Sequence, residues 1–410
     1  MSKLREVRGD FPILDQEIQG RKLVYLDSAA TSQRPLQVQE AVRQYDNRDN
    51  GNPHRGSHTL SLRATEAFEG VREKVRRFLH ARSVKEIIFT KNATEAINLV
   101  AYSYGLSQLK PGDRIVLSIA EHHANLVPWQ QVAKKTGAVL TYLYVDEEGR
   151  LPEKELDKID SATKIVAMSH MSNVLGTIFP VKEVIRRAHA VGAVALIDGA
   201  QAVPHMKVDV TDLDADFYVF SGHKMLSLMG VGVLYGRESL LETMDPFLYG
   251  GDMIEYVHEQ ETSFNELPFK FEAGTQGIEA VVSLGAAIDY LEELGFDAIH
   301  EKEMELLAYA LDQLKALPYI RLVGPSDLKD RGAVVSFVVE DVHPHDVSTI
   351  LDSYGVGVRA GHHCAQPLMR YLKINACTRA SFAFYNTKED IDALVRNLDE
   401  VRRWMGYGSR

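Results

Sequence analysis

Lys224 and Asp198 are the two residues of this chain whose types and spacing most directly indicate chemistry. Lys224 ends the motif Ser-Gly-His-Lys at residues 221–224, directly after the apolar run at 217–220, and Asp198 ends the apolar run at 193–198. A lysine and a carboxylate at successive strand ends suit pyridoxal 5'-phosphate, because the amine forms a Schiff base and the carboxylate pairs with the protonated pyridine nitrogen. A surface lysine on a Ser/Gly turn is the alternative, but the combination with Asp198 favours the cofactor.

Several neighbouring residues are candidates for holding the phosphate of that cofactor. Residues 89–95, Phe-Thr-Lys-Asn-Ala-Thr-Glu, end a predicted strand and open a helix. Backbone N–H groups at Ala93 and the Thr94 hydroxyl could bind a phosphate there, aided by the helix dipole. The alternative is that Thr94 only caps the helix. Ser221 and His223 are further candidates, because a dianion needs several donors.

Three more polar residues follow predicted strands and are candidates for contact with the cofactor ring. His122, in Glu-His-His-Ala-Asn at residues 121–125, could stack on the pyridine ring and donate a proton. Gln201 could reach the phenolic oxygen of the cofactor, and Asn173 could reach the same oxygen or the substrate. Each could equally be a polar loop residue that bonds only to its neighbours.

Cys364 is the candidate nucleophile. It lies in Arg-Ala-Gly-His-His-Cys-Ala-Gln-Pro at residues 359–367, where a glycine and Pro367 predict a loop instead of a packed helix. Arg359 and two histidines flank the thiol, and such a setting favours the reactive thiolate. The other cysteine, Cys377, starts an apolar run and is predicted to serve packing.

Arg379 is the candidate for binding a substrate carboxylate through its planar fork, with a surface salt bridge as the alternative. The histidines at 343, 345, 362 and 363 raise the question of a metal. Their spacing matches no regular zinc pattern, and the ligands would have to come from separate loops, so no intrinsic metal is predicted.

The composition argues against several classes of protein, namely nucleic-acid-binding, secreted and membrane proteins. The net charge of −11 and the lack of a Lys/Arg-rich block argue against a nucleic-acid partner. The charged start, Met-Ser-Lys-Leu-Arg-Glu-Val-Arg, does not resemble a signal peptide, and no apolar run reaches membrane-spanning length. With only two cysteines in 410 residues, the composition fits a reducing cytosol, and we expect a cytoplasmic protein.

Seven short apolar runs predict the strands that must position these residues. They lie at residues 86–90, 114–118, 138–145, 164–169, 193–198, 217–220 and 231–235. Helical patterns lie between many of them, for example at 181–190. This alternation is typical of an α/β fold with a mainly parallel sheet covered on both faces, and ligands bind at the carboxyl ends of such strands.

The pattern changes after a long helical stretch at 278–317, which Gly295 interrupts. Further strands are predicted at 333–339, 357–359 and 379–385, and further helices at 345–354 and 388–404. We therefore predict a large domain at residues 21–290 and a smaller α+β domain, made of 1–20 and 291–410, that carries the cysteine loop.

Taken together, these segments resemble those of class V, fold-type I pyridoxal-phosphate-dependent transferases, and more narrowly of SUF-type (group II) cysteine desulfurases. The resemblance covers nearly the whole chain. The matching segments lie at residues 26–33, 54–61, 94–100, 121–123, 198–201, 221–224, 271–275 and 359–367. The short loop around Cys364 favours group II over group I, whose cysteine loop is longer and more mobile.

The resemblance implies a role for each candidate. Lys224 holds the cofactor and moves the Cα proton of the substrate, Asp198 pairs with the pyridinium, and Cys364 is the nucleophile. The remaining contacts that the resemblance implies are ring stacking by His122, an oxygen contact by Gln201, phosphate binding by Thr94, Ser221 and His223, and substrate binding by Arg379, Asn173 and Arg359. Thr275 would bind the phosphate of the other subunit, which implies a homodimer.

The implied reaction converts L-cysteine to L-alanine and leaves a persulfide on Cys364. The sulfur then passes to a SufU-like or SufE-like acceptor for iron–sulfur cluster assembly. His343 and His345, in His-Pro-His-Asp, resemble forms that use the zinc-containing SufU type, in which a histidine takes over the zinc of the partner.

Two departures from the family pattern are present. Ser227-Leu228 stand where the family usually has Gly-Pro, and Gln276-Gly277 follow Thr275 where it usually has proline. Proline and glycine fix loop geometry. We therefore expect the loop after Lys224 to be shifted or more mobile, and the contact of Thr275 with the phosphate to be looser.

Other functions are compatible with the same residues. A selenocysteine lyase or another class V enzyme would use the same scaffold, and an aminotransferase would not need Cys364. A catalytically silent protein that docks a scaffold is the alternative of another class, and only the loop departures support it.

Overall fold

The computed structural model describes residues 4 and 7–407. Parts of the predicted small-domain segments 1–20 and 291–410, and of the charged N-terminus, therefore lie outside the described residues. Among the described residues, Arg8 of the N-terminal segment donates to the Tyr385 carbonyl and to Asp390 near the C-terminus. The domain boundaries themselves stay a prediction.

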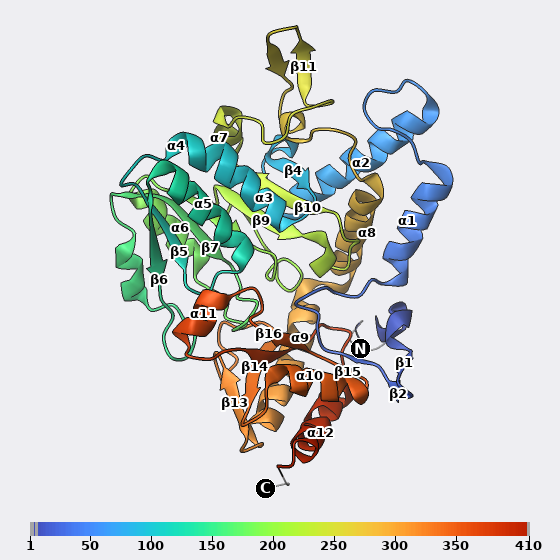
Figure 1. Ribbon diagram of the computed structural model, residues 1–410. Helices are drawn as coiled ribbons and strands as arrows, with labels where there is room; N and C mark the ends of the chain where they lie inside the picture. The colour runs from blue at the N-terminus through green and yellow to red at the C-terminus, as the bar shows by residue number, and fades with distance from the viewer. Residues whose placement is uncertain (1–3, 5–6, 408–410) are drawn as a thin grey trace.

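A seven-stranded sheet with the order β4-β10-β9-β8-β7-β5-β6 forms the centre of the molecule (Figure 1). Its strands are β4 (Ile87–Thr90), β5 (Arg114–Ser118), β6 (Val139–Leu143), β7 (Thr163–Ser169), β8 (Val194–Asp198), β9 (Phe217–Ser221) and β10 (Gly232–Gly236). The pairs from β6 through β9 are parallel, and β10 runs antiparallel to both its neighbours. The predicted α/β fold with a mainly parallel seven-stranded sheet is confirmed.

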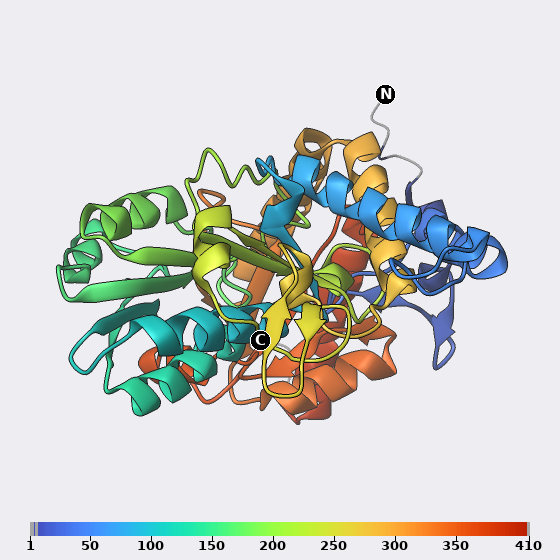
Figure 2. The same ribbon diagram turned by 90° about the horizontal axis from the view of Figure 1, so that it is seen from above.

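Helices cover both faces of this sheet (Figure 2). One face packs on α2 (Thr59–Phe78), α6 (Val181–Ala190) and α8 (Ile278–Leu294), and the other on α3 (Ala93–Val100) and α5 (Val127–Thr136). Successive strand residues point to opposite faces, so a strand that is apolar throughout requires helices on both sides. All five residues of β9 are accordingly buried.

A second, four-stranded sheet lies below the first in Figure 1, with the order β13-β14-β17-β16. Its elements are β13 (Ile320–Val323), β14 (Val334–Val339), β16 (Arg359–Gly361) and β17 (Cys377–Ser381), with α9 (Phe296–Lys315), α10 (Pro344–Ser353) and α12 (Lys388–Trp404). These elements share an apolar core of their own. Gly295, at φ 84°, ends α8 and starts α9, as the sequence predicts.

The other elements are short or peripheral. They are α1 (Leu36–Arg48), α4 (Leu106–Gln108), α7 (Glu238–Thr243), α11 (Gln366–Tyr371), β1 (Glu17–Ile18), β2 (Arg21–Lys22), β3 (Val24–Tyr25), β11 (Ile254–Val257), β12 (Thr262–Phe264) and β15 (Val356–Gly357). Strand β3 pairs in parallel with β15 in a two-stranded sheet of their own, which ties the N-terminal segment to the C-terminal part of the chain. Within the described part of the chain, no helix is both long and apolar enough to cross a membrane.

Two strand predictions differ from the structure. The strand predicted at 379–385 ends at Ser381, because Asn386 closes a turn: its amide donates to the Ala383 carbonyl and its side-chain oxygen accepts from the Ala383 amide. The strand predicted at 357–359 is divided between β15 and β16, which belong to different sheets.

A buried ion pair fixes the segment at residues 271–275. Arg72 and Glu272 form two parallel hydrogen bonds of 2.7 and 2.8 Å, and their side chains are 0% and 2% exposed. Glu272 also accepts from the Phe89 amide, and Arg72 donates to the Ile87 carbonyl. The pair therefore joins α2, β4 and the segment that carries Thr275.

We expect Glu272→Gln to lower the free energy of unfolding of the cofactor-free protein by about 3 kcal/mol, the low end for breaking a buried pair, because it removes the buried one of the two carboxylates that compensate Arg72 and leaves only the partly exposed Glu69. Urea-induced unfolding measures this loss. Asp212→Asn is the matched control, because Asp212 pairs with Lys182 at the surface and exposed pairs contribute little. Equal effects of the two substitutions would contradict the role of the buried pair.

Candidate active site

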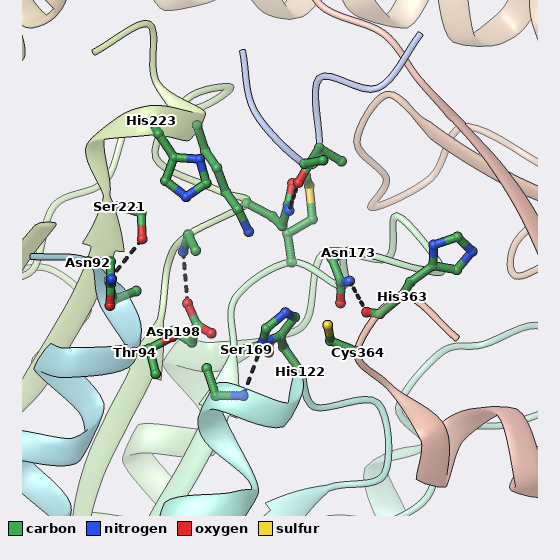
Figure 3. Close-up of a pocket in the computed structure, with 18 of the residues that line it drawn as sticks. Asn92, Thr94, His122, Ser169, Asn173, Asp198, Ser221, His223, His363 and Cys364 are labelled. Carbon is green, nitrogen blue, oxygen red and sulfur yellow. Dashed lines mark hydrogen bonds between the residues drawn. The ribbon is translucent and has the colours of Figure 1, made fainter. Parts of the chain in front are cut away.

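A cavity of about 340 Å³ opens at the carboxyl ends of β7, β8 and β9 (Figure 3). It is lined from both sheets and from the loops between them. Every site residue predicted from the sequence lines this cavity except Thr275: Ala93, Thr94, His122, Asn173, Asp198, Gln201, Ser221, His223, Lys224, Arg359, Cys364 and Arg379. Residues separated by nearly 300 positions in the sequence thus share one site.

Lys224 and Asp198 occupy the end of the cavity nearest the large sheet. Asp198 is the last residue of β8, and Lys224 ends a single turn that follows β9. Burial lowers the pKa of Lys224 to about 8, although the negative charge of Asp198 raises it in part. Burial likewise raises the pKa of Asp198, opposed by the Ala200 amide and by Lys224. The site therefore holds an amine that loses its proton easily. Beside it lies a carboxylate whose charged form a positively charged partner would stabilise.

The segment at residues 28–33 fixes the Lys224 turn. The Thr31 hydroxyl and the Ser32 amide both donate to the His223 carbonyl, at 2.9 and 3.0 Å, and the Leu226 amide donates to the Ser32 hydroxyl at 2.7 Å. These bonds hold the backbone on both sides of Lys224, so only its side chain is free to move.

The N-terminus of α3 and the end of β9 form the predicted phosphate corner. Asn92, not Thr94, caps α3: its side-chain oxygen accepts from the Glu95 amide at 2.9 Å. The interpretation of Thr94 as a simple cap is therefore wrong, and its hydroxyl is available at the cavity. Ser221 Oγ accepts from the Ala93 amide at 2.8 Å, which leaves the Ser221 proton for a ligand.

His122 and His223 are held as neutral imidazoles. Burial, followed by the charge of Lys224, lowers the pKa of His122 to about 3 and that of His223 to about 4. The Ala124 amide donates to His122 Nδ1 at 3.0 Å, so the ring proton lies on Nε2. A neutral ring with a fixed tautomer can stack on an aromatic ligand and donate one hydrogen bond to it.

Glu121 supports the His122 loop and was not among the predicted site residues. Its buried carboxylate accepts from the Ser169 amide and hydroxyl and from Asn125, at 3.0, 2.7 and 2.7 Å. Asn125 in turn accepts from Trp129 at 3.0 Å. The Glu-His-His-Ala-Asn motif could have indicated the bond between Glu121 and Asn125, since these two residues are four positions apart and flank the histidine.

The Cys364 loop is strained and fastened to the large sheet. His363 and Cys364 have φ values of 50° and 54°, in the left-handed region that non-glycine residues rarely adopt. Asn173 donates to the His363 carbonyl at 2.8 Å (Figure 3). The His123 amide donates to the Cys364 carbonyl at 2.7 Å. These bonds present the exposed thiol to the cavity.

The loop prediction beyond Cys364 is wrong, because α11 begins at Gln366 with Pro367 in its first turn. Proline is tolerated there, since the amide it lacks would have no helical partner. Cys377 is buried, which confirms its packing position.

Arg379 is buried and not a surface salt bridge, so that interpretation is wrong. Its side chain is 3% exposed, and it donates to the Asn173 carbonyl at 3.0 Å and to Asp27 at 3.2 Å. Arg359 also bonds to Asp27 and lines the cavity. The two guanidinium groups form the part of the site suited to a carboxylate.

The remaining predicted residues lie away from this cavity. Thr275 is exposed, and its contact with the phosphate of another subunit stays a prediction. The exposed rings of His343 and His345 stack at 5.4 Å, and His343 caps α10. In residues 4 and 7–407, no cluster of three or more His, Cys, Asp or Glu side chains is placed to hold a metal.

Pyridoxal 5'-phosphate fits the residues that line this cavity. Lys224 offers a readily neutral amine and His122 a neutral ring for stacking. Asp198 offers a buried carboxylate that accepts from the Ala200 amide and, among the described residues, forms no salt bridge. Gln201 donates to the Ala29 carbonyl at 2.7 Å, which leaves its side-chain oxygen as an acceptor. The phosphate corner lies at the N-terminus of α3, the usual position for an anion.

Known proteins resemble this chain over nearly its full length. A family model described as aminotransferase class-V matches residues 24–394. A probable cysteine desulfurase of Halalkalibacterium halodurans is 54% identical over 98% of both chains, and one of Staphylococcus aureus is 51% identical over 98% of both. Among solved structures, cysteine desulfurases of Escherichia coli (CsdA) and Thermococcus onnurineus are each 40% identical. They cover 98% of this chain, and it covers 99% and 100% of theirs, with TM-scores of 0.90 and 0.93.

Attachment of pyridoxal 5'-phosphate to the cofactor-free protein should speed up as pH rises, with a midpoint near the Lys224 pKa of about 8. Only the neutral amine attacks the aldehyde, and an exposed lysine reaches that form only near pH ~10.4. Absorbance after rapid mixing gives the rate. N-acetyl-lysine, measured in parallel, corrects for ionisation of the cofactor, and a midpoint above pH ~10 would contradict the burial argument.

Proposed function

The chain belongs to the aminotransferase class V family, and we propose that it is a pyridoxal-phosphate-dependent cysteine desulfurase that converts L-cysteine to L-alanine. One observation carries this proposal: the Cys364 thiol and the Lys224 amine line the same cavity, beside two arginines that can hold an amino-acid carboxylate. An amine alone would serve many class V reactions, but a thiol beside it supplies a nucleophile for sulfur.

Lys224, Asp198, His122, Gln201 and the phosphate corner at Thr94 would hold the cofactor. When bound, pyridoxal 5'-phosphate supplies an electron sink for the carbanion formed at Cα of the substrate. Asp198 would keep a proton on the ring nitrogen of the bound cofactor, and His122 would pack against its ring. Thr275 of the other subunit would complete the phosphate site, so the proposal includes a homodimer.

The reaction then depends on three side chains of the cavity. Arg379 orients the substrate through its carboxylate, and Lys224 removes the Cα proton. The Cys364 thiolate attacks the substrate sulfur: a sulfur–sulfur bond forms, the Cβ–S bond breaks, and its electron pair stays with the substrate. Protonation of Cβ, which takes up the proton that Cys364 lost on becoming a thiolate, and return of the Cα proton by Lys224 yield alanine, and Cys364 keeps the persulfide.

The loop around Cys364 is fit for this attack because it does not have to fold over the site first. The carbonyls of His363 and Cys364 are already bonded to Asn173 and to the His123 amide, in the segments that follow β7 and β5 of the large sheet. A short, fastened loop limits the distance that the persulfide can travel. We therefore propose that an acceptor protein comes to the site, and that it is a SufU-like or SufE-like protein serving iron–sulfur cluster assembly in the cytoplasm.

Cys364→Ser should reduce alanine release from L-cysteine by about a thousandfold, because the hydroxyl is a far weaker nucleophile toward sulfur. Cofactor absorption should stay unchanged, since Cys364 takes no part in binding the cofactor. Alanine release, together with the intact protein mass showing one added sulfur atom, measures the reaction.

Cys377→Ala is the matched control, because Cys377 is buried outside the cavity. It should retain both the activity and the added sulfur. Alanine release without a persulfide on Cys364 in the unsubstituted protein would rule out the proposed route. An aminotransferase would be insensitive to Cys364→Ser.

His343→Ala should slow sulfur transfer to a zinc-containing SufU-type acceptor and leave alanine release without an acceptor unchanged. His343 caps α10, so His343→Asn, which can keep the cap, separates zinc exchange from helix stability. His300→Ala, at an exposed position on α9, is the control. Normal transfer by both His343 variants would contradict the zinc-exchange role.

A further inference from the structure

Asp27 lies between the two arginines of the carboxylate-binding part of the cavity. Its carboxylate accepts from Arg359 Nε and Nη2, at 3.1 and 2.9 Å, and from Arg379 Nη2 at 3.2 Å. The backbone on both sides of Asp27 is fixed, because Ser381 donates to the Leu26 carbonyl at 2.8 Å and accepts from Ala29 at 2.9 Å. The Asp27 carboxylate is therefore held in one position between the two arginines.

Strand pairing places the two arginines directly opposite each other. Strands β16 and β17 are antiparallel, with Arg359 opposite Arg379. Like charges at such positions repel, because their Cβ atoms are only about 4.5–5.5 Å apart. Asp27 offsets this repulsion: two guanidinium groups and one carboxylate leave one net positive charge.

The arginines differ in how firmly they are held. The Arg379 side chain is 3% exposed, and within the described residues its Nε is buried without a hydrogen-bond partner. Arg379 also lines the cavity, so its guanidinium group can bind a substrate carboxylate. The Arg359 side chain is 50% exposed and rests on Asp27. Arg359 can therefore turn toward a ligand, and its Nε and Nη2 donors become available to that ligand only by leaving Asp27.

We propose that Asp27 is a positioning residue that limits the amino-acid site to ligands with a single carboxylate. With Asp27 ionised, the one net positive charge is matched by the α-carboxylate of cysteine. A second anionic group on the ligand side chain would have to compete with Asp27 for Arg359. The inference rests on the proposed function, because it assumes that an α-amino acid occupies the cavity.

The test compares Asp27→Asn with the unsubstituted holoenzyme. L-Alanine and L-aspartate are the probes, because they share an α-carboxylate and differ by one carboxylate on the side chain. Titration followed by the visible absorption of the bound cofactor gives both dissociation constants. The substitution should shift the ratio of the two constants about tenfold in favour of L-aspartate, which is about 1.4 kcal/mol.

Asp27→Glu keeps the charge and should restore discrimination against L-aspartate. Asp327→Asn is the matched control, because Asp327 also pairs with an arginine, Arg150, but at the surface. It should leave the ratio unchanged. If Asp27 had a merely structural role, Asp27→Asn would weaken the binding of both probes equally. An unchanged ratio of the two dissociation constants in Asp27→Asn would therefore overturn the proposal.

Arg359→Gln provides a second measurement should Asp27→Asn fail to fold. It removes one positive charge at an exposed position, so it should weaken L-aspartate binding more than L-alanine binding. An unchanged ratio in this variant would also overturn the proposal. Alanine release from L-cysteine by the unsubstituted protein is measured separately, so failure of the proposed function is distinguished from failure of the Asp27 inference.

Discussion

The site depends on the hydrogen bonds that fasten the Cys364 loop to the large sheet. The thiol belongs to a segment between β16 and β17 of the four-stranded sheet, whereas Asp198 ends β8 of the seven-stranded sheet and Lys224 lies in the turn after β9. Two successive residues of the loop adopt left-handed backbone angles, each at a cost of about 1–3 kcal/mol. A hydrogen bond contributes only about 0.5–1.5 kcal/mol, so several are needed to hold this shape. The bonds from Asn173, from the His123 amide and from His363 to the Cys377 carbonyl provide them.

Charge compensation is the second constraint, and it divides the cavity in two. Near the large sheet, burial makes Lys224 readily neutral and leaves Asp198 in need of a positive partner. At the second sheet, Arg359 and Arg379 face each other and share Asp27. The first half suits a cationic ring nitrogen and an aldehyde, and the second suits a carboxylate. An amino acid spans the two halves only in one orientation, with its amino group toward Lys224.

The residues that react could be predicted from the sequence because each directly follows an apolar strand or lies in a distinctive loop. Asp198 and Lys224 are placed by parallel strands whose carboxyl ends meet at one edge. Asp27 could not be assigned a role in this way, since its partner Arg379 lies about 350 positions away and only folding brings them together. For Glu121 the motif contains one partner, Asn125, but the bond to Ser169, 48 positions away, is also made only on folding. The capping role of Asn92 was missed because Thr94 satisfies the same local rule. The strand predicted at 379–385 overran Ser381 because apolar residues continue into a turn.

The departures from the family pattern show how side chains can replace a proline. At the loop after Lys224, the Ser227 hydroxyl lies 2.7 Å from that of Ser283 on α8, and the Leu228 amide donates to Ser283 at 3.0 Å. Ser227 and Ser283 are buried, so water does not compete for these bonds. Similarly, the Gln276 side chain donates to the Gly274 carbonyl at 3.0 Å, beside Thr275. Proline restricts a loop through its own ring, whereas these bonds restrict it through α8 and through the turn itself. The order of both loops in this chain therefore depends on side-chain packing instead of on backbone stiffness.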